Sequence, residues 1–258
     1  SDSTADKAAA SLSVSVGSSA DPDDRAGLAH FLEHMLFLGT DKYPEPDEYQ
    51  AFISEHGGSH NAFTSFNETN YFFDIDPSHF EPALDRFSRF FIQPLFNPDY
   101  VEREKHAVHS EYTARLKNDY RRQKDALSAV LNPAHPYSRF SVGNLETLAD
   151  REGNLVRASL LDFYARHYSA NRMNLVVLAP AGLDQLETLI RQKFAAVPNT
   201  NSQPIEFDVP YFQSGQLPLQ LNIKPERDTR SLSLLFPLPS VYSYYAEKPL
   251  DYISHLLG

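Results

Sequence analysis

Two histidines and a glutamate occur within one short stretch, His30-Phe31-Leu32-Glu33-His34. Residues four apart lie on one face of a helix, so the imidazoles of His30 and His34 would project toward one point with Glu33 beside it. Such imidazoles are typical zinc ligands, and an adjacent carboxylate can take a proton from a water that the metal holds. This order, H-x-x-E-H, is the reversed zinc-peptidase motif. The stretch therefore predicts a hydrolytic metal centre with Glu33 as its base.

A buried amphipathic helix whose histidines bond only to the backbone is the alternative interpretation of this stretch. The residues around the motif, from Leu28 to Leu38, are otherwise almost all apolar. Burying two histidines and a glutamate among them costs free energy unless a cation or polar partners compensate. We therefore favour the metal centre.

The third metal ligand is expected on the charged stretch from Glu102 to Glu111, because a catalytic zinc usually has three protein ligands and one open position. Glu104 and Glu111 are about two helical turns apart and share a face. His106 and His109 point elsewhere by the same spacing, which favours a solvated or supporting role for them. These residues alone do not choose between the two glutamates, and a charge-rich helix is often only a solvated face.

Composition limits the classes of protein and of partner. Of the 258 residues 41% are hydrophobic and 22% charged, which is typical of a globular protein with a substantial core. No run of about 18 apolar residues occurs, so no membrane span is expected. The net charge of −11 argues against nucleic acid as the main partner. The absence of cysteine excludes disulfides and thiolate ligands.

Hydrophobic periodicity predicts an α+β chain, with helices packed on a largely antiparallel sheet in a two-layer sandwich. Strands are expected at 11–17, 59–66, 69–75 and 172–179, and helices at 25–38, 47–56, 77–91, 99–131, 144–167 and 183–194.

Three segments are expected along the chain. Residues 1–198 form a first, zinc-binding domain, and residues 199–215, rich in Pro, Asn, Ser and Gln, form a linker. Residues 216–258 would begin a second, truncated domain, with strands at 217–223 and 231–238 and a helix at 248–257. The polar start and the helical pattern at the end favour a fragment of a longer protein.

Further short stretches accompany the motif. They are Tyr43-Pro44, residues 54–58, 61–65, 70–71, 83–87, 90–91 and 94–96, Ser110-Glu111, His135-Pro136, Gly143-Asn144 and residues 171–175. Together with residues 30–40 they resemble the N-terminal part of the pitrilysin and insulysin family of zinc metallopeptidases.

The resemblance implies a complete metal site. In that family the third ligand is a glutamate 77 positions after the second histidine, which is the separation of His34 and Glu111 (111 − 34 = 77). Glu104 would then orient a ligand histidine, and each chain would hold one Zn²⁺. Glu33 would take the proton from the attacking water and pass it to the leaving amine.

The family also implies how a peptide binds. Four related domains enclose a chamber, so the remaining domains of a full-length chain are expected partners. The peptide would pair as an extra strand with a sheet edge that carries Asn61, Ala62 and Phe63 beside the metal. Phe37 and Phe63 are candidates for lining the pocket next to the scissile bond, although core packing explains them equally well.

The expected function is that of a zinc-dependent endopeptidase domain acting on peptides and small unfolded polypeptides. The alternatives are a non-catalytic structural or processing-complex subunit of the same fold, and an unrelated metal-binding domain. The intact motif, with Glu33 as a base that a structural site does not need, favours the enzyme. The isolated chain is expected to be weakly active or inactive, and the resemblance to pitrilysin suggests the bacterial periplasm.

Overall fold

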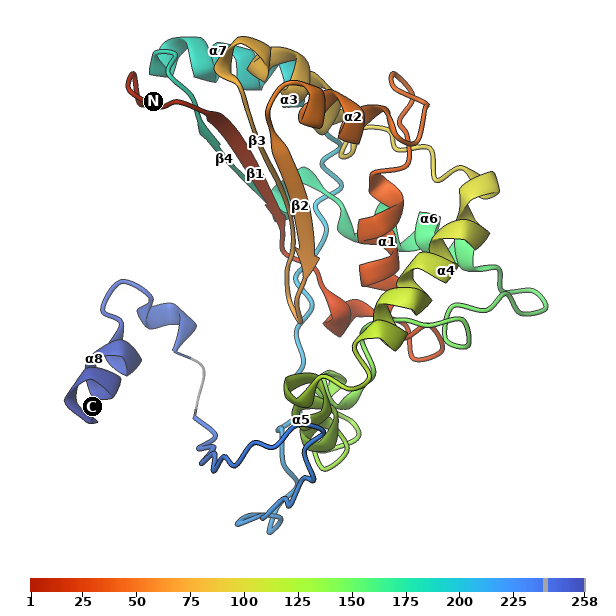
Figure 1. The fold of residues 1–258 in the computed structure, drawn as a ribbon, viewed down its shortest axis with the longest axis vertical. Coiled ribbons are helices and arrows are strands. Elements are labelled where there is room, and N and C mark those ends of the chain that lie inside the picture. Colours follow the sequence, from red (N-terminus) through yellow and green to blue (C-terminus); the bar gives the residue numbers. More distant parts are fainter. Residues whose placement is uncertain (239–240, 258) are drawn as a thin grey trace. The chain divides into compact units, whose positions relative to one another are not determined.

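The computed structural model describes residues 1–238 and 241–257, in two units, Ser1–Lys224 and Pro225–Gly258. The first unit contains a four-stranded antiparallel sheet in the order β2-β3-β1-β4 (Figure 1). The strands are β1 Ala8–Val14, β2 Ser59–Thr64, β3 Thr69–Ile75 and β4 Met173–Leu178. The predicted α+β class with an antiparallel sheet packed by helices is confirmed.

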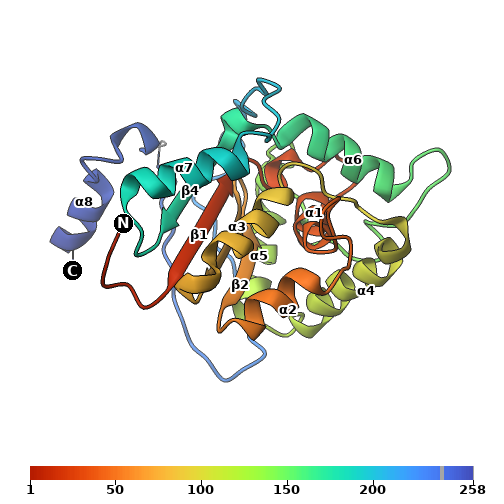
Figure 2. The same cartoon turned by 90° about the horizontal axis from the view of Figure 1, so that it is seen from above.

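Seven α-helices belong to the described part of the first unit. They are α1 Leu28–Leu36, α2 Glu48–Glu55, α3 Phe80–Arg89, α4 Pro98–Ala114, α5 Asp119–Ser128, α6 Val156–His167 and α7 Leu183–Phe194. Figures 1 and 2 show α1, α2, α4 and α6 on the same side of the sheet. The second unit contains α8 Pro249–Leu257. Among the described residues, no helix has the length and apolar character that a membrane crossing requires.

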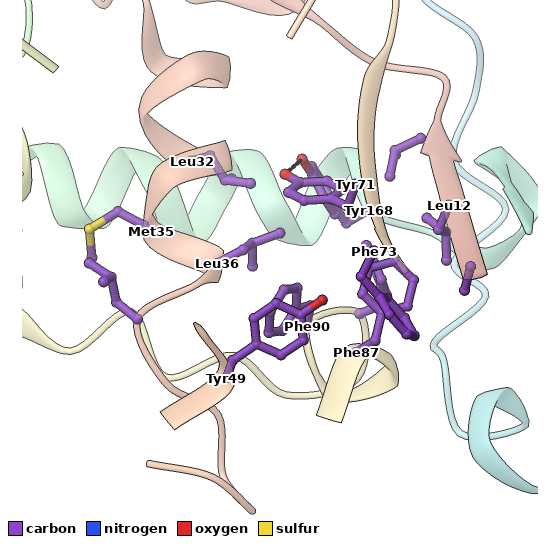
Figure 3. Packing of buried hydrophobic residues seen from close by; sticks show 14 of the residues in the cluster. Leu12, Leu32, Met35, Leu36, Tyr49, Tyr71, Phe73, Phe87, Phe90 and Tyr168 are labelled. Carbon is purple, nitrogen blue, oxygen red and sulfur yellow. Dashed lines mark hydrogen bonds between the residues drawn. The ribbon is translucent and has the colours of Figure 1, made fainter. Parts of the chain in front are cut away.

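The core lies between the sheet and the helices (Figure 3). In β1 and β3 the buried side chains alternate with less buried ones, because neighbouring residues of a strand point to opposite faces. Leu32 and Leu36 of α1 are fully buried together with Tyr71 of β3. The hydroxyl of Tyr71 forms a 2.7 Å hydrogen bond with that of Tyr168, so the one polar atom of each ring is satisfied inside the core. This packing fixes α1 against the sheet.

The helix expected over residues 99–131 is two helices in the structure. Helix α4 ends at Ala114, and α5 begins after Asn118, whose side-chain oxygen accepts a hydrogen bond from the backbone N–H of Arg121. An asparagine at this position caps a new helix, which hydrophobic periodicity alone does not reveal. Glu111 therefore lies in the last turn of α4, and α5 is a separate helix.

Two further expectations of regular structure were wrong. Residues 144–155 form turns, and α6 starts only at Val156, whose backbone N–H donates to the side chain of Asp150. Residues 217–223 and 231–238 form no strand, since no neighbouring strand pairs with them among the described residues. The predicted division into residues 1–198, 199–215 and 216–258 stays a prediction, and the boundary between the two units follows Lys224.

The start of α1 depends on one buried carboxylate. Asp21, which is 3% exposed, accepts hydrogen bonds from the backbone N–H groups of Gly27 at 2.7 Å and Ala29 at 2.8 Å. These donors have no partner within the helix, because the first turn of a helix leaves its N–H groups unpaired. Asp21 thereby fixes where α1 begins, and so where its two histidines lie.

Replacing Asp21 with alanine should lower the free energy of unfolding by about 1–3 kcal/mol, because two buried N–H groups lose their acceptor. Urea denaturation followed by circular dichroism measures this change. The control is Asp23→Ala, which removes a nearby carboxylate whose side chain is 88% exposed and pairs with Arg139. The control should cost less than about 1 kcal/mol. Equal effects of the two substitutions would contradict the role given to Asp21.

Candidate metal centre

Three side chains from two helices meet at one point beside the sheet. Helix α1 contributes His30 and His34, and α4 contributes Glu111. The Nε2 atoms of the two histidines are 3.3 Å apart, and Oε2 of Glu111 lies 3.6 Å from Nε2 of His30 and 3.5 Å from Nε2 of His34. Among the described residues this is the one cluster of three potential metal-ligating groups.

The spacing of these atoms fits zinc. A tetrahedral zinc ion lies about 2.0–2.1 Å from imidazole nitrogens and about 2.0–2.2 Å from carboxylate oxygens, which places neighbouring ligand atoms about 3.3–3.5 Å apart. The three observed separations agree with that range to within about 0.1 Å. Two imidazoles and one carboxylate also form a donor set used in catalytic zinc sites, with a fourth position open.

Both histidines are oriented through their other ring nitrogen. Nδ1 of His30 donates to the backbone carbonyl of Val142 at 2.6 Å, and Nδ1 of His34 donates to the carboxylate of Glu104 at 2.8 Å. With the proton on Nδ1, the neutral ring presents the lone pair of Nε2 to the centre. Oxygen partners of this kind fix the tautomer and the ring orientation of metal-binding histidines.

The carboxylate of Glu111 is held in a similar way. Its Oε1 atom forms a 3.0 Å ion pair with Arg115, one turn further along α4. Its Oε2 atom is thereby left for the centre, 3.5 Å from His34. The contact with His34 and then the charges of His30 and Arg115 lower the pKa of Glu111 to about 2, although partial burial opposes this. Glu111 is therefore an anion at neutral pH.

Two glycines allow the backbone to reach His30. Gly27 precedes α1 with a φ of +89°, and a Cβ atom there would lie 2.2 Å from the backbone nitrogen of Gly143. The positive φ and this close approach both exclude larger residues. Because the two backbones touch at this point, the carbonyl of Val142 comes within hydrogen-bonding distance of His30.

Glu33 lies beside the cluster and is 7% exposed. Its Oε2 atom accepts a hydrogen bond from the hydroxyl of Thr64, the last residue of β2. Burial raises the pKa of the Glu33 carboxyl, and the bond from Thr64 partly offsets this effect. A carboxylate with a raised pKa, fixed beside a metal centre, is suited to accept and return a proton.

Without a metal ion, the positive charge at the centre is carried by a protonated His34. Burial disfavours a charge on His34, but hydrogen bonds to Glu104 and Glu111 outweigh burial and raise its pKa to about 9. The pKa of His30 is lowered, first by burial and then by the positive charge of His34. A metal ion must therefore displace the proton of His34 in order to bind.

A cavity of about 1210 Å³ opens beside the metal cluster, with walls from α1, β2, α4, α5 and residues 138–142. The four residues expected to contact substrate all line this cavity: Phe37, Asn61, Ala62 and Phe63.

The two phenylalanines differ in their surroundings. Phe63 is 47% exposed, whereas the ring of Phe37 also packs against Tyr49 and Phe90. The structure brings all four residues beside the His-His-Glu cluster, and their role in binding stays a prediction.

Sequence reasoning missed three contributors to the centre. Thr64 lies in a stretch that was noted, but nothing in the sequence predicted its bond to Glu33. Arg115 follows Glu111 by four residues, a helical spacing that could have indicated the ion pair. Val142 contributes only a backbone carbonyl, so no side-chain pattern could reveal it.

The fold and the cluster together define an α+β domain with a His-His-Glu cluster that could hold a metal ion. Residues 1–140 match the family model described as Insulinase (Peptidase family M16), and residues 154–258 match the model described as Peptidase M16 inactive domain. Since the first match alone covers more than half of the sequence, the chain belongs to the insulinase family, peptidase family M16. The resemblance to pitrilysin and insulysin noted in the sequence is thereby confirmed.

Similar proteins span the whole chain and are much longer than it. Insulin-degrading enzyme from Bos taurus is 46% identical over 261 residues, which are 100% of this chain and 26% of that protein. The A-factor-processing enzyme of Saccharomyces cerevisiae is 42% identical over 260 residues, 100% of this chain and 25% of that protein. A Schizosaccharomyces pombe relative, provisionally named as a zinc protease, is 39% identical over 260 residues, 100% of this chain and 27% of that protein. The chain spans about a quarter of the length of these relatives.

A solved structure agrees with the fold. The crystal structure of pitrilysin superposes with a TM-score of 0.82 at 40% sequence identity, over 84% of this chain and 23% of that chain. Protease relatives of this family imply zinc for the His-His-Glu cluster.

Zinc affinity should rise with pH between about 6 and 9, because His34 binds a proton in the metal-free protein below its pKa of about 9. Each unit of pH should strengthen binding up to about tenfold while one proton is released. Titration with buffered zinc at several pH values measures the slope. His106→Gln, which changes an exposed histidine on α4, should leave the slope unchanged. An affinity independent of pH would show that His34 is neutral without metal.

Proposed function

We propose that this chain is the metal-binding part of a zinc-dependent endopeptidase that hydrolyses peptides and small unfolded polypeptides. The observation that carries the proposal is the convergence of two oriented imidazoles and one carboxylate at zinc-like spacing, with a buried carboxylate beside them. A structural metal site needs no such additional carboxylate beside its ligands. The position of Glu33 therefore favours catalysis over a purely structural role.

His30, His34 and Glu111 would hold the metal, with Glu104 and the carbonyl of Val142 fixing the two imidazoles. A zinc ion at this position supplies a Lewis acid for a peptide carbonyl and lowers the pKa of a water to about 7.

Glu33 would serve as the base. Its carboxylate accepts a proton from the attacking water and then donates that proton to the nitrogen of the leaving amine. The hydroxyl of Thr64 holds one oxygen of Glu33, which leaves the other oxygen for the water. Burial keeps the carboxyl pKa raised, so that the proton can be returned at neutral pH.

The peptide would bind along β2. This strand is at an edge of the sheet, pairs only with β3 in the described sheet, and lines the cavity. An extended peptide can add to such an edge through backbone hydrogen bonds, which are independent of its sequence. Asn61, Ala62 and Phe63 would then face the peptide next to Glu33, with Phe37 contributing to the wall. A cavity of about 1210 Å³ exceeds the space that a small molecule requires, about 300–1,000 Å³, and suits a peptide.

The remaining part of a full-length protein would complete the enzyme. Peptide cleavage requires the substrate to be clamped and shielded from water, and the remaining domains would complete that enclosure. We therefore expect the chain alone to bind metal and to cleave peptides weakly or not at all.

Replacing Glu33 with glutamine should leave zinc bound and lower kcat for a quenched fluorescent peptide by about 10²–10⁴-fold, because the amide cannot accept a proton. The assay uses the full-length protein that carries this chain. Asp47→Asn removes another carboxylate that lines the cavity and should change kcat by less than about threefold. A loss below about tenfold for Glu33→Gln would be too small for a general base.

Replacing His34 with alanine should abolish stoichiometric zinc, since the two remaining ligands hold the ion poorly. Elemental analysis of the dialysed protein should fall from one zinc per chain to near zero, while His106→Ala should retain the metal. Unchanged zinc in the His34 variant would overturn the ligand assignment.

A further inference from the structure

The cavity beside the His-His-Glu cluster is lined by both acidic and basic side chains. Glu33, Glu104 and Glu111 lie at or next to the cluster. Helix α5 and the segment around Arg139 line the same cavity (Figure 1 shows the position of α5). The cationic side chains that line the cavity are Arg103, Arg115, Arg121, Arg122, Lys124 and Arg139.

Three of these six cations are arginines that already bond to an acidic side chain or a backbone carbonyl. Arg115 pairs with Glu111, and Arg139 pairs with Asp23 and donates to the backbone carbonyl of Asp21. Arg122 donates to the backbone carbonyl of Lys224. These bonds leave the three arginines fewer donors for a ligand. The guanidinium of Arg103, on α4, lies 4.9 Å from the centre of the Tyr100 ring.

Arg121 and Lys124 differ from these three arginines. They are three residues apart on α5, both line the cavity, and neither forms an ion pair with a carboxylate in the described part of the chain. The ammonium of Lys124 lies 5.6 Å from the centre of the Tyr137 ring, a contact that leaves its hydrogen-bond donors unused. Two nearby cations without counter-ions repel each other. An anion bound between them would reduce this repulsion.

The charge of Lys124 is disfavoured in the absence of such an anion. Partial burial and then the positive charge of Arg121 lower its pKa. Asp125, also on α5 and lining the cavity, is the nearest acidic residue in sequence, and it forms no ion pair with either cation among the described residues. The cavity therefore retains, beside α5, positive charge without a carboxylate partner among the described residues.

We propose that Arg121 and Lys124 form a carboxylate-binding subsite that selects peptides with an acidic side chain or a free C-terminal carboxylate a few residues from the scissile bond. The inference rests on the proposed peptidase function, since the ligand is the peptide itself. An arginine guanidinium can bind a carboxylate through two parallel hydrogen bonds, and a lysine adds a point charge. β2 and α5 line the same cavity, so a peptide paired with β2 would bring its flanking residues toward this pair.

The test measures binding and cleavage separately. Full-length protein with Glu33→Gln, which binds without cleaving, is titrated with fluorescent peptides that differ only by Glu or Gln at each position around the cleavage site. A second pair of peptides differs by a free acid or an amide at the C-terminus. One acidic member should bind about tenfold more tightly than its neutral partner, and added salt should reduce the difference. A preference for internal Glu identifies a side-chain ligand, and a preference for the free acid identifies a chain end.

The variant R121Q/K124Q should reduce this preference to less than about twofold. K117Q is the matched control, because Lys117 is an exposed cation between α4 and α5 that does not line the cavity, and it should keep the preference. D125N should increase the preference, since it removes the one acidic group of α5 that lines the cavity. R121E should reverse the preference, so that peptides with Lys bind more tightly than peptides with Glu. This variant provides an independent test of the subsite if the double variant does not fold.

Two results would overturn the proposal. One is equal affinity for acidic and neutral peptides in the protein with Arg121 and Lys124 intact. The other is an acidic preference that survives both R121Q/K124Q and R121E. Cleavage of the neutral peptides by the unaltered protein, lost on Glu33→Gln, checks the proposed peptidase function independently. A failure of the subsite is therefore distinguishable from a failure of the enzyme.

Discussion

The metal centre depends on one constraint, which is that both imidazoles use Nδ1 for an oxygen partner and so present Nε2 to the same point. One partner is a side chain of α4, and the other is a backbone carbonyl of the segment between α5 and α6. Helix α1 must therefore keep a fixed position against both elements. Its buried face joins the core that includes Tyr71 of β3, and the helix also contacts β2, α4 and α6. Asp21 fixes its first turn. The core around Tyr71 and Leu36 serves the site by holding this position.

The carboxylates around the centre favour the binding of a cation. Three carboxylates approach the centre, those of Glu33, Glu104 and Glu111. Without metal, a protonated His34 and Arg115 supply two positive charges for these three carboxylates. Arg121 and Lys124, which line the same cavity, form no ion pair with a carboxylate among the described residues.

The sequence predicted those parts of the site that depend on local spacing. His30, Glu33 and His34 are fixed relative to one another by helix geometry, and the family resemblance supplied Glu111 and Glu104. Helix breaks were harder to predict, because the cap at Asn118 lies within a continuous charged pattern. Strands expected in residues 217–223 and 231–238 have the right composition but no partner strand among the described residues. Pairing is a property of the whole fold and cannot be deduced from a segment.

The contact between Gly27 and Gly143 has a consequence for how variation in this protein should be interpreted. The group that orients His30 is the carbonyl of Val142, which every amino acid possesses, so the identity of residue 142 carries no information about this function. The requirement falls instead on the two positions where the backbones touch. In a library of natural or engineered variants, the signature of the metal centre would therefore include a pair of invariant glycines that contact no metal. A search restricted to side chains near the ion would overlook them.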